Sequence, residues 1–273
     1  MSNSPFFSII TVSFNQATFL PKCLASVSSQ GFKSCQHIVV DPGSHDGSRE
    51  LILGFQSDLI LPVFQKDSCA PEGLNHGLAK VAGVYTLFVN SDDYLVDGAL
   101  DLVYARLVQS GFPDILFMGG YIEDLNAGSR RRFFPGSIHG KIHAFGLSQI
   151  FQQGSVVKSD IVRRAKGFNT SNRTCWDGEL FLQLLADPDV YASRSPDPVA
   201  VFVIHPGSIT GSGRGKGQYL LDSARIVKTY YGPRAYSFRV FLSRFPRVFR
   251  LVLKYMLDLR LALWRFTSLR FRR

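Results

Sequence analysis

The sequence predicts an α/β fold with a mostly parallel central sheet flanked by helices. Short apolar runs rich in β-branched residues alternate with helical patterns of about 10–15 residues through the first 120 residues. The chain has 273 residues, of which 45% are hydrophobic and 19% charged, and this composition excludes a disordered protein. A chain of this length buries enough surface to fold without disulfides or a structural metal.

The predicted strands and helices follow one another in a regular order. Strands are expected where β-branched and aromatic residues run together, at 7–13, 37–40, 59–64 (the weakest), 85–89, 114–118 and 199–204. Helices are expected where apolar residues recur at helical spacing, from Asn15 to Gly31, at 74–81, at 100–108 and at 179–185. Both patterns dissolve at 127–146, and 206–217 is a glycine-rich loop. The chain has no internal repeat.

The positive charge is confined to the end of the chain. Residues 233–273 hold ten Arg and one Lys against one Asp, so the whole formal net charge of +10 lies in this segment. A neutral body with a basic tail argues against a nucleic-acid-binding protein, which needs basic charge on its folded face.

The cysteines and the apolar segments predict the compartment. Cys23, Cys35, Cys69 and Cys175 show neither metal spacing nor a disulfide framework, which fits a reducing environment. Residues 1–12 lack the basic region of a secretory signal, and no apolar run reaches the length of a membrane span. We therefore expect a cytoplasmic protein.

Three groups of carboxylates lie where such a sheet binds its ligands. They occupy 41–48 after the second strand, 90–93 after the fourth strand and 176–179 before the late helix. Carboxylates at strand ends suit hard cations, and a cation would relieve the repulsion between adjacent Asp92 and Asp93. The alternative is structural: Asp46 and Asp97 would cap helices, and Asp41 would begin a turn.

Four segments resemble the family 2 glycosyltransferases, which are inverting enzymes with the Rossmann-like GT-A fold. The segments are Ser8 to Asn15, Val40 to Ser48, Leu74 to Gly77 and Phe88 to Asp93, in the order and spacing of that family. The resemblance covers about the first 110 residues. It implies a sugar transfer from a nucleotide-diphosphate donor, a UDP-sugar, by direct displacement at the anomeric carbon.

The resemblance also implies roles for individual residues. Asp93 would ligate Mg²⁺ or Mn²⁺ at the donor diphosphate, and Asp92 would touch the donor ribose or support the metal. Asp177 would be the general base that takes the proton of the acceptor hydroxyl. The other residues implied in donor binding are Val12, Phe14, Asn15, Asp41 and Asn75.

The sequence departs from the family pattern at several positions. Pro42 replaces a second acidic residue, a glycine is missing near Cys69, and Trp176 stands where a Glu is frequent. The His-Gln pair of the acceptor region corresponds to Gln152 and Gln153. The donor half therefore matches better than the acceptor half.

The segment after the last predicted strand has the composition of a phosphate-binding loop. His205 is a candidate second metal ligand, although a lone histidine after a strand is often structural. Glycines, hydroxyls and cations suit a diphosphate, and an ordinary surface loop is the alternative. The residues proposed for this loop are Ser208, Thr210, Arg214 and Lys216.

The basic tail reads as an amphipathic helix after Pro246, with a shorter helix at 237–244 before it. A basic stripe on an apolar and aromatic helix is typical of docking on an anionic membrane surface; packing on the body or on another subunit is the alternative. We predict a glycosyltransferase domain at 1–232, with a donor half at 1–120 and an acceptor half at 121–232, and a membrane-associating tail at 233–273.

These predictions give a metal-dependent glycosyltransferase at the inner face of the cytoplasmic membrane. Its partners would be a nucleotide-sugar, a glycan or lipid-linked acceptor and the anionic membrane, with no nucleic acid. Two alternatives are a nucleotidyltransferase and a membrane-associated adaptor with a degenerate donor site. The first lacks a glycine-rich phosphate loop with Lys near the first strand, and the second does not account for Asp92, Asp93 and Asp177 together.

Overall fold

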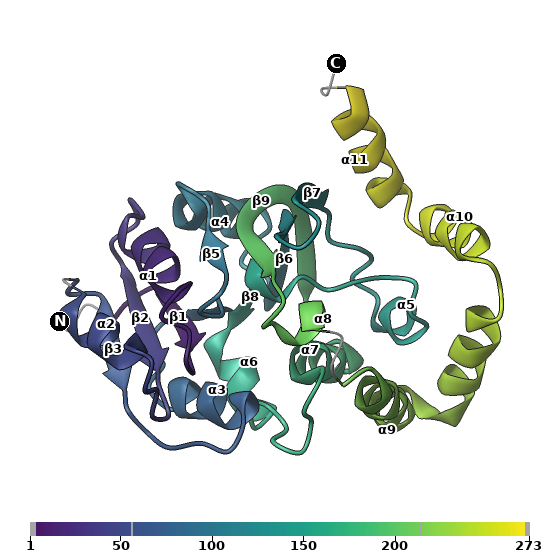
Figure 1. Cartoon of the computed structure of the whole chain (residues 1–273). Coiled ribbons are helices and arrows are strands. Elements are labelled where there is room, and N and C mark those ends of the chain that lie inside the picture. Colours follow the sequence, from purple (N-terminus) through teal and green to yellow (C-terminus); the bar gives the residue numbers. More distant parts are fainter. Residues whose placement is uncertain (1–3, 56, 213–214, 271–273) are drawn as a thin grey trace.

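The structure is a computed structural model that describes residues 4–55, 57–212 and 215–270 (Figure 1). Within these residues a nine-stranded sheet has the order β3-β2-β1-β4-β8-β6-β9-β5, and β7 pairs with β6. Helices cover both faces of the sheet, and three helices at the C-terminal end run along one side of it (Figure 1). The predicted α/β fold is confirmed.

The first half of the sheet is parallel. Its strands are β1 (Phe7–Val12), β2 (Cys35–Val40), β3 (Ile60–Val63) and β4 (Tyr85–Phe88). The helices between and after them are α1 (Leu20–Ser28), α2 (Ser48–Gly54), α3 (Ala70–Leu78) and α4 (Ala99–Gln109). Because successive strand residues point to opposite faces, Ile9 packs with α1 and α4, whereas Ile10 packs with α3. Both faces of β1, β2 and β4 are therefore buried, which explains why most residues of these strands are apolar.

The second half of the sheet is mixed rather than parallel. Strand β8 runs antiparallel to both of its neighbours, β4 and β6, while β6 and β9 are parallel. The strands here are β5 (Tyr94–Leu95), β6 (Ile115–Asp124), β7 (Ser129–Phe133), β8 (Ser155–Lys158) and β9 (Ala192–Ile204). The other elements are α5 (Gly140–Ala144), the 3₁₀ helix η1 (Gln152–Gly154), α6 (Ser159–Arg164) and α7 (Trp176–Ala186).

Several boundaries differ from the sequence-based expectation. Helix α7 begins at Trp176 rather than Glu179, so the third carboxylate group lies inside its first turn. The strand expected at 199–204 is the second half of β9, whose first half contains two prolines that hide the strand pattern. The segment expected as a loop at 206–217 includes the short helix α8 (Ile209–Ser212).

The tail consists of α9 (Lys216–Ser243), α10 (Arg247–Leu257) and α11 (Leu259–Arg270). Helix α9 runs across residue 232, the sequence-based domain boundary, and it is kinked there because Gly232 has φ 83° and Pro233 follows. A positive φ is readily adopted by glycine, and proline cannot continue the helical hydrogen bonds. The helix expected at 237–244 is the end of α9, and Pro246 separates α9 from α10 as predicted.

The tail is also attached to the body at the junction between α10 and α11. The carboxylate of Asp258, between α10 and α11, accepts two hydrogen bonds from the Arg194 guanidinium of β9, one of them 2.6 Å long. Both side chains of this ion pair are nearly excluded from water. Two leucines of the tail, Leu242 and Leu261, are also buried. Across the described residues, none of the helices is both long and apolar enough to cross a membrane.

Candidate active site

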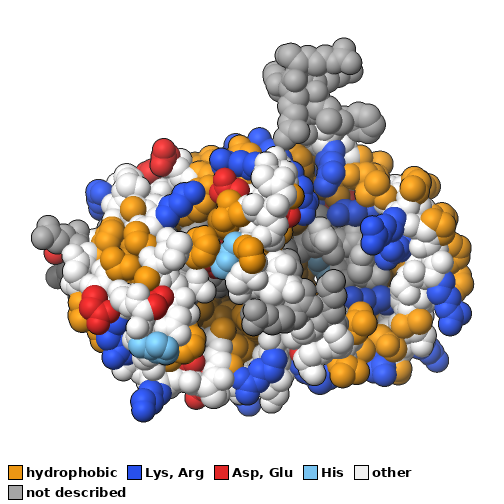
Figure 2. Space-filling view, viewed as in Figure 1, with side chains coloured by type: hydrophobic (Ala, Val, Ile, Leu, Met, Phe, Trp, Pro, Cys, Tyr) orange, Lys and Arg blue, Asp and Glu red, His pale blue; other side chains and the backbone are white. Residues whose placement is uncertain are grey.

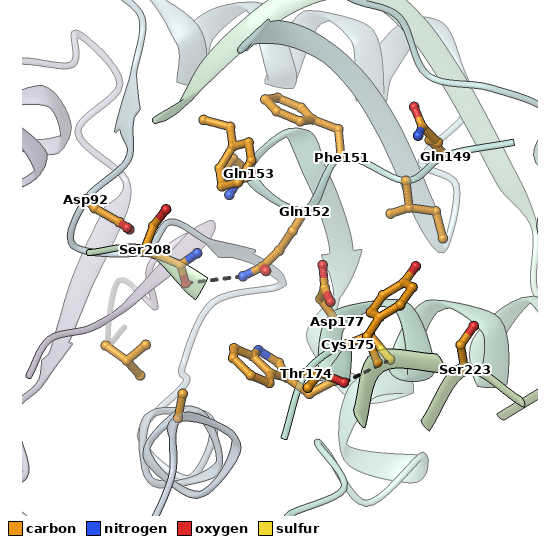
Figure 3. A pocket seen from close by; sticks show the side chains of 18 of the residues that line it. Asp92, Gln149, Phe151, Gln152, Gln153, Thr174, Cys175, Asp177, Ser208 and Ser223 are labelled. Atoms are coloured by element: carbon orange, nitrogen blue, oxygen red, sulfur yellow. Dashed lines mark hydrogen bonds between the residues drawn. The ribbon is translucent and has the colours of Figure 1, made fainter. Parts of the chain in front are cut away.

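A cavity of about 930 Å³ opens at the carboxyl ends of β1 and β4 (Figure 3). One wall comes from the segments that follow these two strands and from the loop after β9. The opposite wall comes from the start of α7 and from α9. Residues that line the cavity and bear on its chemistry are Val12, Phe14, Asn90, Asp92, Arg131, His143, Gln152, Gln153, Asp177, Ser208, Tyr219, Ser223 and Arg239.

The adjacent aspartates after β4 have different surroundings. Asp92 lines the cavity, and its Oδ2 lies 3.2 Å from Nε2 of His205, which follows β9. Asp93 is buried behind it. The carboxylate of Asp93 accepts hydrogen bonds from the backbone N–H of Val203 (2.8 Å), from Gln153 Nε2 (2.6 Å) and from Asn90. The carboxylate exposed to a ligand is therefore that of Asp92, and Asp93 ties together the strand ends behind it.

The electrostatics of this pair favour a cation. Burial, and then the neighbouring charge of Asp92, raise the pKa of Asp93 well above its ordinary value. A positive ion at Asp92 would offset that repulsion. The Asp92 carboxylate and the His205 imidazole are ligands that Mn²⁺ accepts, and Mg²⁺ and Mn²⁺ sites commonly take one or two protein ligands beside phosphate oxygens. The described residues contain no group of three acidic, His or Cys side chains that would hold a metal without help from a ligand.

The loops after β1 and β2 form the other end of the cavity. Val12 and Phe14 line it, and the Phe14 ring is 54% exposed. The Asn15 backbone N–H donates to Ser44 Oγ (2.9 Å), and Asn15 Oδ1 accepts from the His45 N–H (3.1 Å), so Asn15 joins the two loops. Asn15 positions this end of the cavity without lining it.

Asp41 is fully buried at the end of β2. Its Oδ1 accepts from the backbone N–H groups of Gly43 and Ser44, both at 2.9 Å, and from Arg49 at 3.2 Å. Its Oδ2 has no hydrogen-bond partner among the described residues. A buried acceptor without a partner is costly. Asp41 does not line the cavity, whereas the next residue, Pro42, does.

Asn75 has a structural role in α3. Its amide nitrogen donates to the carbonyl of Phe168 (2.9 Å), and its Oδ1 accepts from the Phe168 N–H (2.8 Å). This side chain joins α3 to the segment before α7 and is not part of the cavity wall. In the segment 74–77, which resembles a family motif, Asn75 therefore makes a packing contact between two parts of the chain.

Asp177 lies in the first turn of α7 and faces into the cavity (Figure 3). Burial raises the pKa of Asp177 above its ordinary value, although hydrogen bonds from backbone N–H groups at the helix start oppose this. A carboxylate with a raised pKa is a stronger base than one in water, so the site suits proton removal.

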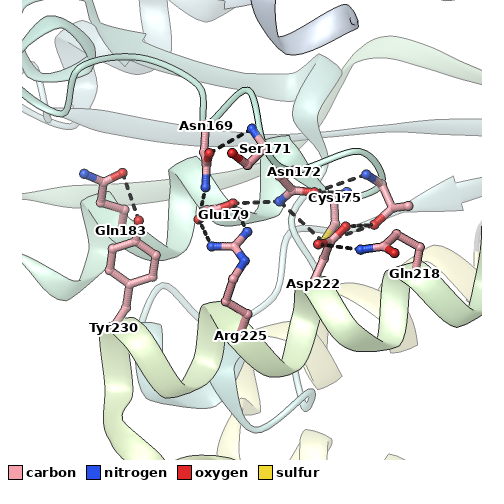
Figure 4. Close-up of polar contacts among 11 residues, drawn as sticks. Asn169, Ser171, Asn172, Cys175, Glu179, Gln183, Gln218, Asp222, Arg225 and Tyr230 are labelled. Carbon is pink, nitrogen blue, oxygen red and sulfur yellow. Dashed lines mark hydrogen bonds and ion pairs between the residues drawn. The ribbon is translucent and has the colours of Figure 1, made fainter.

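The neighbouring Glu179 is occupied by other contacts (Figure 4). It receives two hydrogen bonds of 2.7 Å from Arg225 of α9 and one each from Asn169 (3.0 Å) and Asn172 (2.7 Å). Although burial alone would raise the pKa of Glu179, these hydrogen bonds lower it. Glu179 is therefore a poor base, and Asp177 is the carboxylate of α7 that reaches the cavity.

The segment after β9 contributes only partly to the described site. Ser208 lines the cavity, and its hydroxyl bonds the backbone around His205. Arg214 and the side chains of Thr210 and Lys216 lie outside the described residues. Their assignment to a diphosphate loop stays a prediction.

A family model for glycosyl transferase family 2 matches residues 8–152, more than half of the chain. The chain belongs to this family. A Streptococcus pneumoniae glycosyltransferase, GlyA, is 31% identical over 37% of the chain and 15% of its own length. A GalNAc(5)-diNAcBac-PP-undecaprenol beta-1,3-glucosyltransferase of Campylobacter jejuni is 32% identical over 37% of the chain and 34% of its own length. The chain thus spans about a third or less of these two relatives.

Three other proteins align with most of the length of this chain. An uncharacterized glycosyltransferase of Mycobacterium tuberculosis is 24% identical over 90% of the chain and 96% of its own length. Staphylococcus aureus TarS 1–349, solved with UDP-GlcNAc, aligns over 91% of the chain and 72% of its own with a TM-score of 0.66 and 14% identity. The mannosyltransferase PcManGT of Pyrobaculum calidifontis, solved with GDP-Man and Mn²⁺, aligns over 97% and 83% with a TM-score of 0.59 and 14% identity. The two solved structures show that the fold is GT-A.

Sequence reasoning missed several cavity residues of this glycosyltransferase. Arg131 belongs to the basic run at 130–132, which reads as a solvated face, and yet it lines the cavity from β7. Tyr219 and Arg239 lie on α9, and Arg239 falls within the segment expected to bind membrane. Helical spacing alone does not tell which side of α9 meets the body, so these residues had no distinguishing signal.

Proposed function

We propose that this chain transfers a sugar with inversion from a nucleotide-diphosphate donor, a UDP-sugar, to a hydroxyl group of a lipid-linked glycan. The reaction requires Mn²⁺ or Mg²⁺ and takes place at the cytoplasmic face of the membrane. The observation that carries the proposal is that Asp92 and Asp177 line different walls of one cavity (Figure 3). A site for the leaving diphosphate and a base for the acceptor thus meet in one space.

The donor binds at the ends of β1, β2 and β4. The nucleoside lies against Val12 and Phe14, beside Pro42, which also lines the cavity. We assign the base N–H to Oδ2 of Asp41, the residue before Pro42; this oxygen is buried and unpartnered, and Asp41 itself does not line the cavity. An imide N–H of uracil fits a lone carboxylate acceptor, which supports a uridine donor. The relative solved with UDP-GlcNAc supports the same nucleotide, whereas the one solved with GDP-Man makes guanosine the competing choice.

Asp92 and His205 would hold the metal, with Asp93 held by protein donors behind Asp92. A divalent cation bound there would supply positive charge that stabilises the leaving diphosphate. This assignment differs from the sequence-based one, which gave the metal to Asp93. The reason is that both oxygens of Asp93 already accept hydrogen bonds from protein donors.

Asp177 removes the proton of the acceptor hydroxyl as that oxygen attacks the anomeric carbon. The bond from the acceptor oxygen to the sugar forms while the bond from the sugar to the diphosphate breaks, so the configuration inverts. The pKa of Asp177, raised by burial, suits a group that must take a proton and release it to water afterwards.

The tail supports an acceptor at a membrane. Apolar side chains of α10 point away from the body, and Val248 and Met256 are 72% and 70% exposed. Figure 2 shows hydrophobic side chains with Lys and Arg among them along the right-hand rim, where Figure 1 has the end of α9 and α10. An exposed apolar helix face beside basic residues is typical of a helix that lies in an anionic membrane surface. The name of the Campylobacter jejuni relative, which includes PP-undecaprenol, supports a lipid-linked acceptor.

The test is nucleotide release from a panel of donors. The full chain is incubated with UDP- and GDP-sugars in Mn²⁺, in Mg²⁺ and in EDTA, and free nucleotide is measured. We expect release of UDP from one or more UDP-sugars in metal and none in EDTA. Release from GDP-sugars alone would overturn the uridine assignment, and equal release in EDTA would overturn the metal requirement.

A further inference from the structure

The amphipathic helix α10 has its two faces reversed from the usual arrangement in a soluble protein. Its apolar residues Val248, Val252 and Met256 are exposed. Two of its basic residues, Arg250 and Lys254, are partly buried. They line a groove together with the exposed Arg247 and with Gly146, Leu147 and Leu251. A helix that only covered the body would bury its apolar face.

The groove holds positive charge that the protein does not neutralise. It has a volume of about 230 Å³. Among the residues that the structure describes, no carboxylate forms an ion pair with Arg247, Arg250 or Lys254, and the buried Nε of Arg250 lacks a hydrogen-bond acceptor. The nearby Asp258 is already held by two hydrogen bonds from Arg194. Burial, and then the charge of Arg265, lower the pKa of Lys254, and the charge of Asp258 opposes this only in part.

The groove adjoins the acceptor end of the active-site cavity. Gly146 lines both, and Arg239 lines the cavity close to Gly146. His143 lines the cavity as well. Burial, with a smaller contribution from the charge of Lys254, lowers the pKa of His143 to about 4. The line of cations from Arg239 to Lys254 therefore runs from the cavity to the base of the exposed apolar face.

We infer that this groove binds the phosphate or diphosphate group of a lipid-linked acceptor. This site deepens the proposed function and rests on it. The acceptor sugar would reach Asp177 through the cavity, its anionic linkage would lie on Arg250 and Lys254, and its lipid chain would enter the membrane beside the apolar face of α10. Arginine forks and a lysine point charge are the side chains that hold phosphate oxygens most strongly.

The geometry favours this ligand over an anionic headgroup at the membrane surface. Headgroups are met by the outer side of a docked helix, whereas Arg250 and Lys254 are partly buried over a groove that shares Gly146 with the active-site cavity. When the exposed apolar face of α10 inserts into the membrane surface, the groove lies at the depth of the lipid phosphates. The cations of the groove then stay outside the hydrocarbon. The groove is thus suited to a phosphate that must be held at a fixed distance from a reacting hydroxyl.

The test is direct binding of farnesyl diphosphate to the full chain by calorimetry. EDTA is present throughout, so that metal-dependent diphosphate binding at Asp92 does not contribute. Inorganic pyrophosphate and farnesol serve as separate ligands, and vesicles of phosphatidylcholine with and without phosphatidylglycerol are tested alongside. The variants are Arg250→Gln and Lys254→Gln, and the matched control is Arg244→Gln, which removes the same charge from an exposed position outside the groove.

We expect farnesyl diphosphate to bind more tightly than pyrophosphate or farnesol. Each groove variant should weaken it roughly tenfold, the range for a lost hydrogen bond to a charged group, while Arg244→Gln should not. Unchanged affinity in the groove variants would overturn the site. Equal affinity for pyrophosphate would reassign it to free phosphate, and a loss confined to phosphatidylglycerol vesicles would reassign it to a lipid headgroup; either result overturns the acceptor assignment.

Measuring nucleotide release and farnesyl diphosphate binding on the same protein distinguishes this inference from the proposed reaction. Donor-derived nucleotide release without farnesyl diphosphate binding would count against the groove alone. Farnesyl diphosphate binding without release from any nucleotide-sugar would count against the transferase reaction alone.

Discussion

Arg225 of α9 holds Glu179 of α7 by two hydrogen bonds of 2.7 Å, two residues beyond Asp177 (Figure 4). The Glu179 side chain is only 2% exposed, whereas that of Arg225 is 40% exposed. Because α7 carries Asp177, the proposed base, and α9 carries Tyr219, this pair joins two sides of the cavity. Its hydrogen bonds lower the pKa of Glu179 and so favour the ionised form of that carboxylate.

Replacing Arg225 by Ala should lower both stability and turnover. Glu179 would stay buried with two amide donors and no cation, which costs about 1–3 kcal/mol of unfolding free energy. This is less than the loss for a fully buried pair, because Arg225 is partly exposed. Urea unfolding measures the change, and Arg164→Ala, which removes an exposed pairing with Asp160, is the control with little expected effect.

The pH dependence of that loss identifies the pair. The pKa of Glu179 is lowered in the folded chain, so its contribution to stability is present above the ordinary glutamate pKa of about 4.3 and disappears as the pH falls below it. The stability difference between wild type and Arg225→Ala should therefore shrink in acid. A difference that stays constant to low pH would assign the effect to packing of the Arg225 chain instead.

Asp177→Asn should reduce turnover by a factor on the order of 10²–10⁴, as for a lost general base. The amide keeps the size of the side chain but takes no proton. Donor affinity, followed by thermal shift with a UDP-sugar and Mn²⁺, should change little because Asp177 lies on the wall opposite Asp92. Asp189→Asn, an exposed change just beyond the other end of α7, is the control. Near-normal turnover would move the base to another group.

The raised pKa of Asp177 predicts the acid limb of the activity profile. The base acts only when it is ionised, so activity should fall as the pH drops through that pKa, which lies above the ordinary aspartate value of 3.8. The measurement is kcat/KM against pH, which reports groups of the free enzyme. Donor binding across the same range is the control, and an acid limb at or below 3.8 would contradict the assignment.

The sequence predicted the donor half of the fold well, because each of its main strands and helices has a recognisable pattern within its own short stretch of sequence. In β1 and β4 every residue but one is fully buried between two layers of helices, so the strands appear as runs of mostly apolar, β-branched and aromatic residues. The carboxylates after β4 then follow from the rule that strand ends carry the ligands of an open sheet. The family prediction, made from these segments, is confirmed by the match over 8–152.

The acceptor half was harder because its order depends on contacts distant in sequence. Strand β8 has only four residues and pairs with β4 across some seventy positions, which no local pattern reveals. Which of Asp92 and Asp93 faces the cavity was also unpredictable, since that depends on Val203 and Gln153, two donors more than fifty residues away. The ion pair between Arg194 of β9 and Asp258 after α10 joins residues 64 positions apart, so no local pattern reveals it either.

Asp92→Ala and Asp93→Ala should separate metal binding from folding. Asp92→Ala should abolish Mn²⁺-dependent donor binding and leave the unfolding temperature nearly unchanged, because its carboxylate contacts His205 at the cavity surface. Asp93→Ala should destabilise the chain by about 1–3 kcal/mol, since it leaves the Val203 N–H and two amides buried without an acceptor. Manganese titrations of donor binding and urea unfolding measure the two effects. Retained Mn²⁺ dependence in Asp92→Ala would return the metal to Asp93.

If α10 docks on the membrane, its exposed apolar side chains should contribute to membrane binding. Deleting the whole tail would not isolate this contribution. Removing 233–273 would also take Arg239 from the cavity wall and the Asp258 partner from Arg194. Val252→Asp and Met256→Asp instead change exposed residues on the outer face, where an aspartate is repelled by an anionic surface and removes apolar burial. Both variants should fold normally and bind donor as wild type does.

Co-sedimentation with vesicles containing phosphatidylglycerol measures the docking. Wild type should sediment at low salt and be released only in part as salt rises, because screening weakens the attraction of the basic residues but leaves apolar insertion in place. The aspartate variants should sediment weakly and lose what remains on addition of salt. Glu50→Gln, a change on α2 far from the tail in the sequence, should behave as wild type. Equal sedimentation of wild type and both variants would show that the outer face of α10 does not meet the membrane, and would leave Asp92 and Asp177 as the basis of a transferase that finds its acceptor in solution.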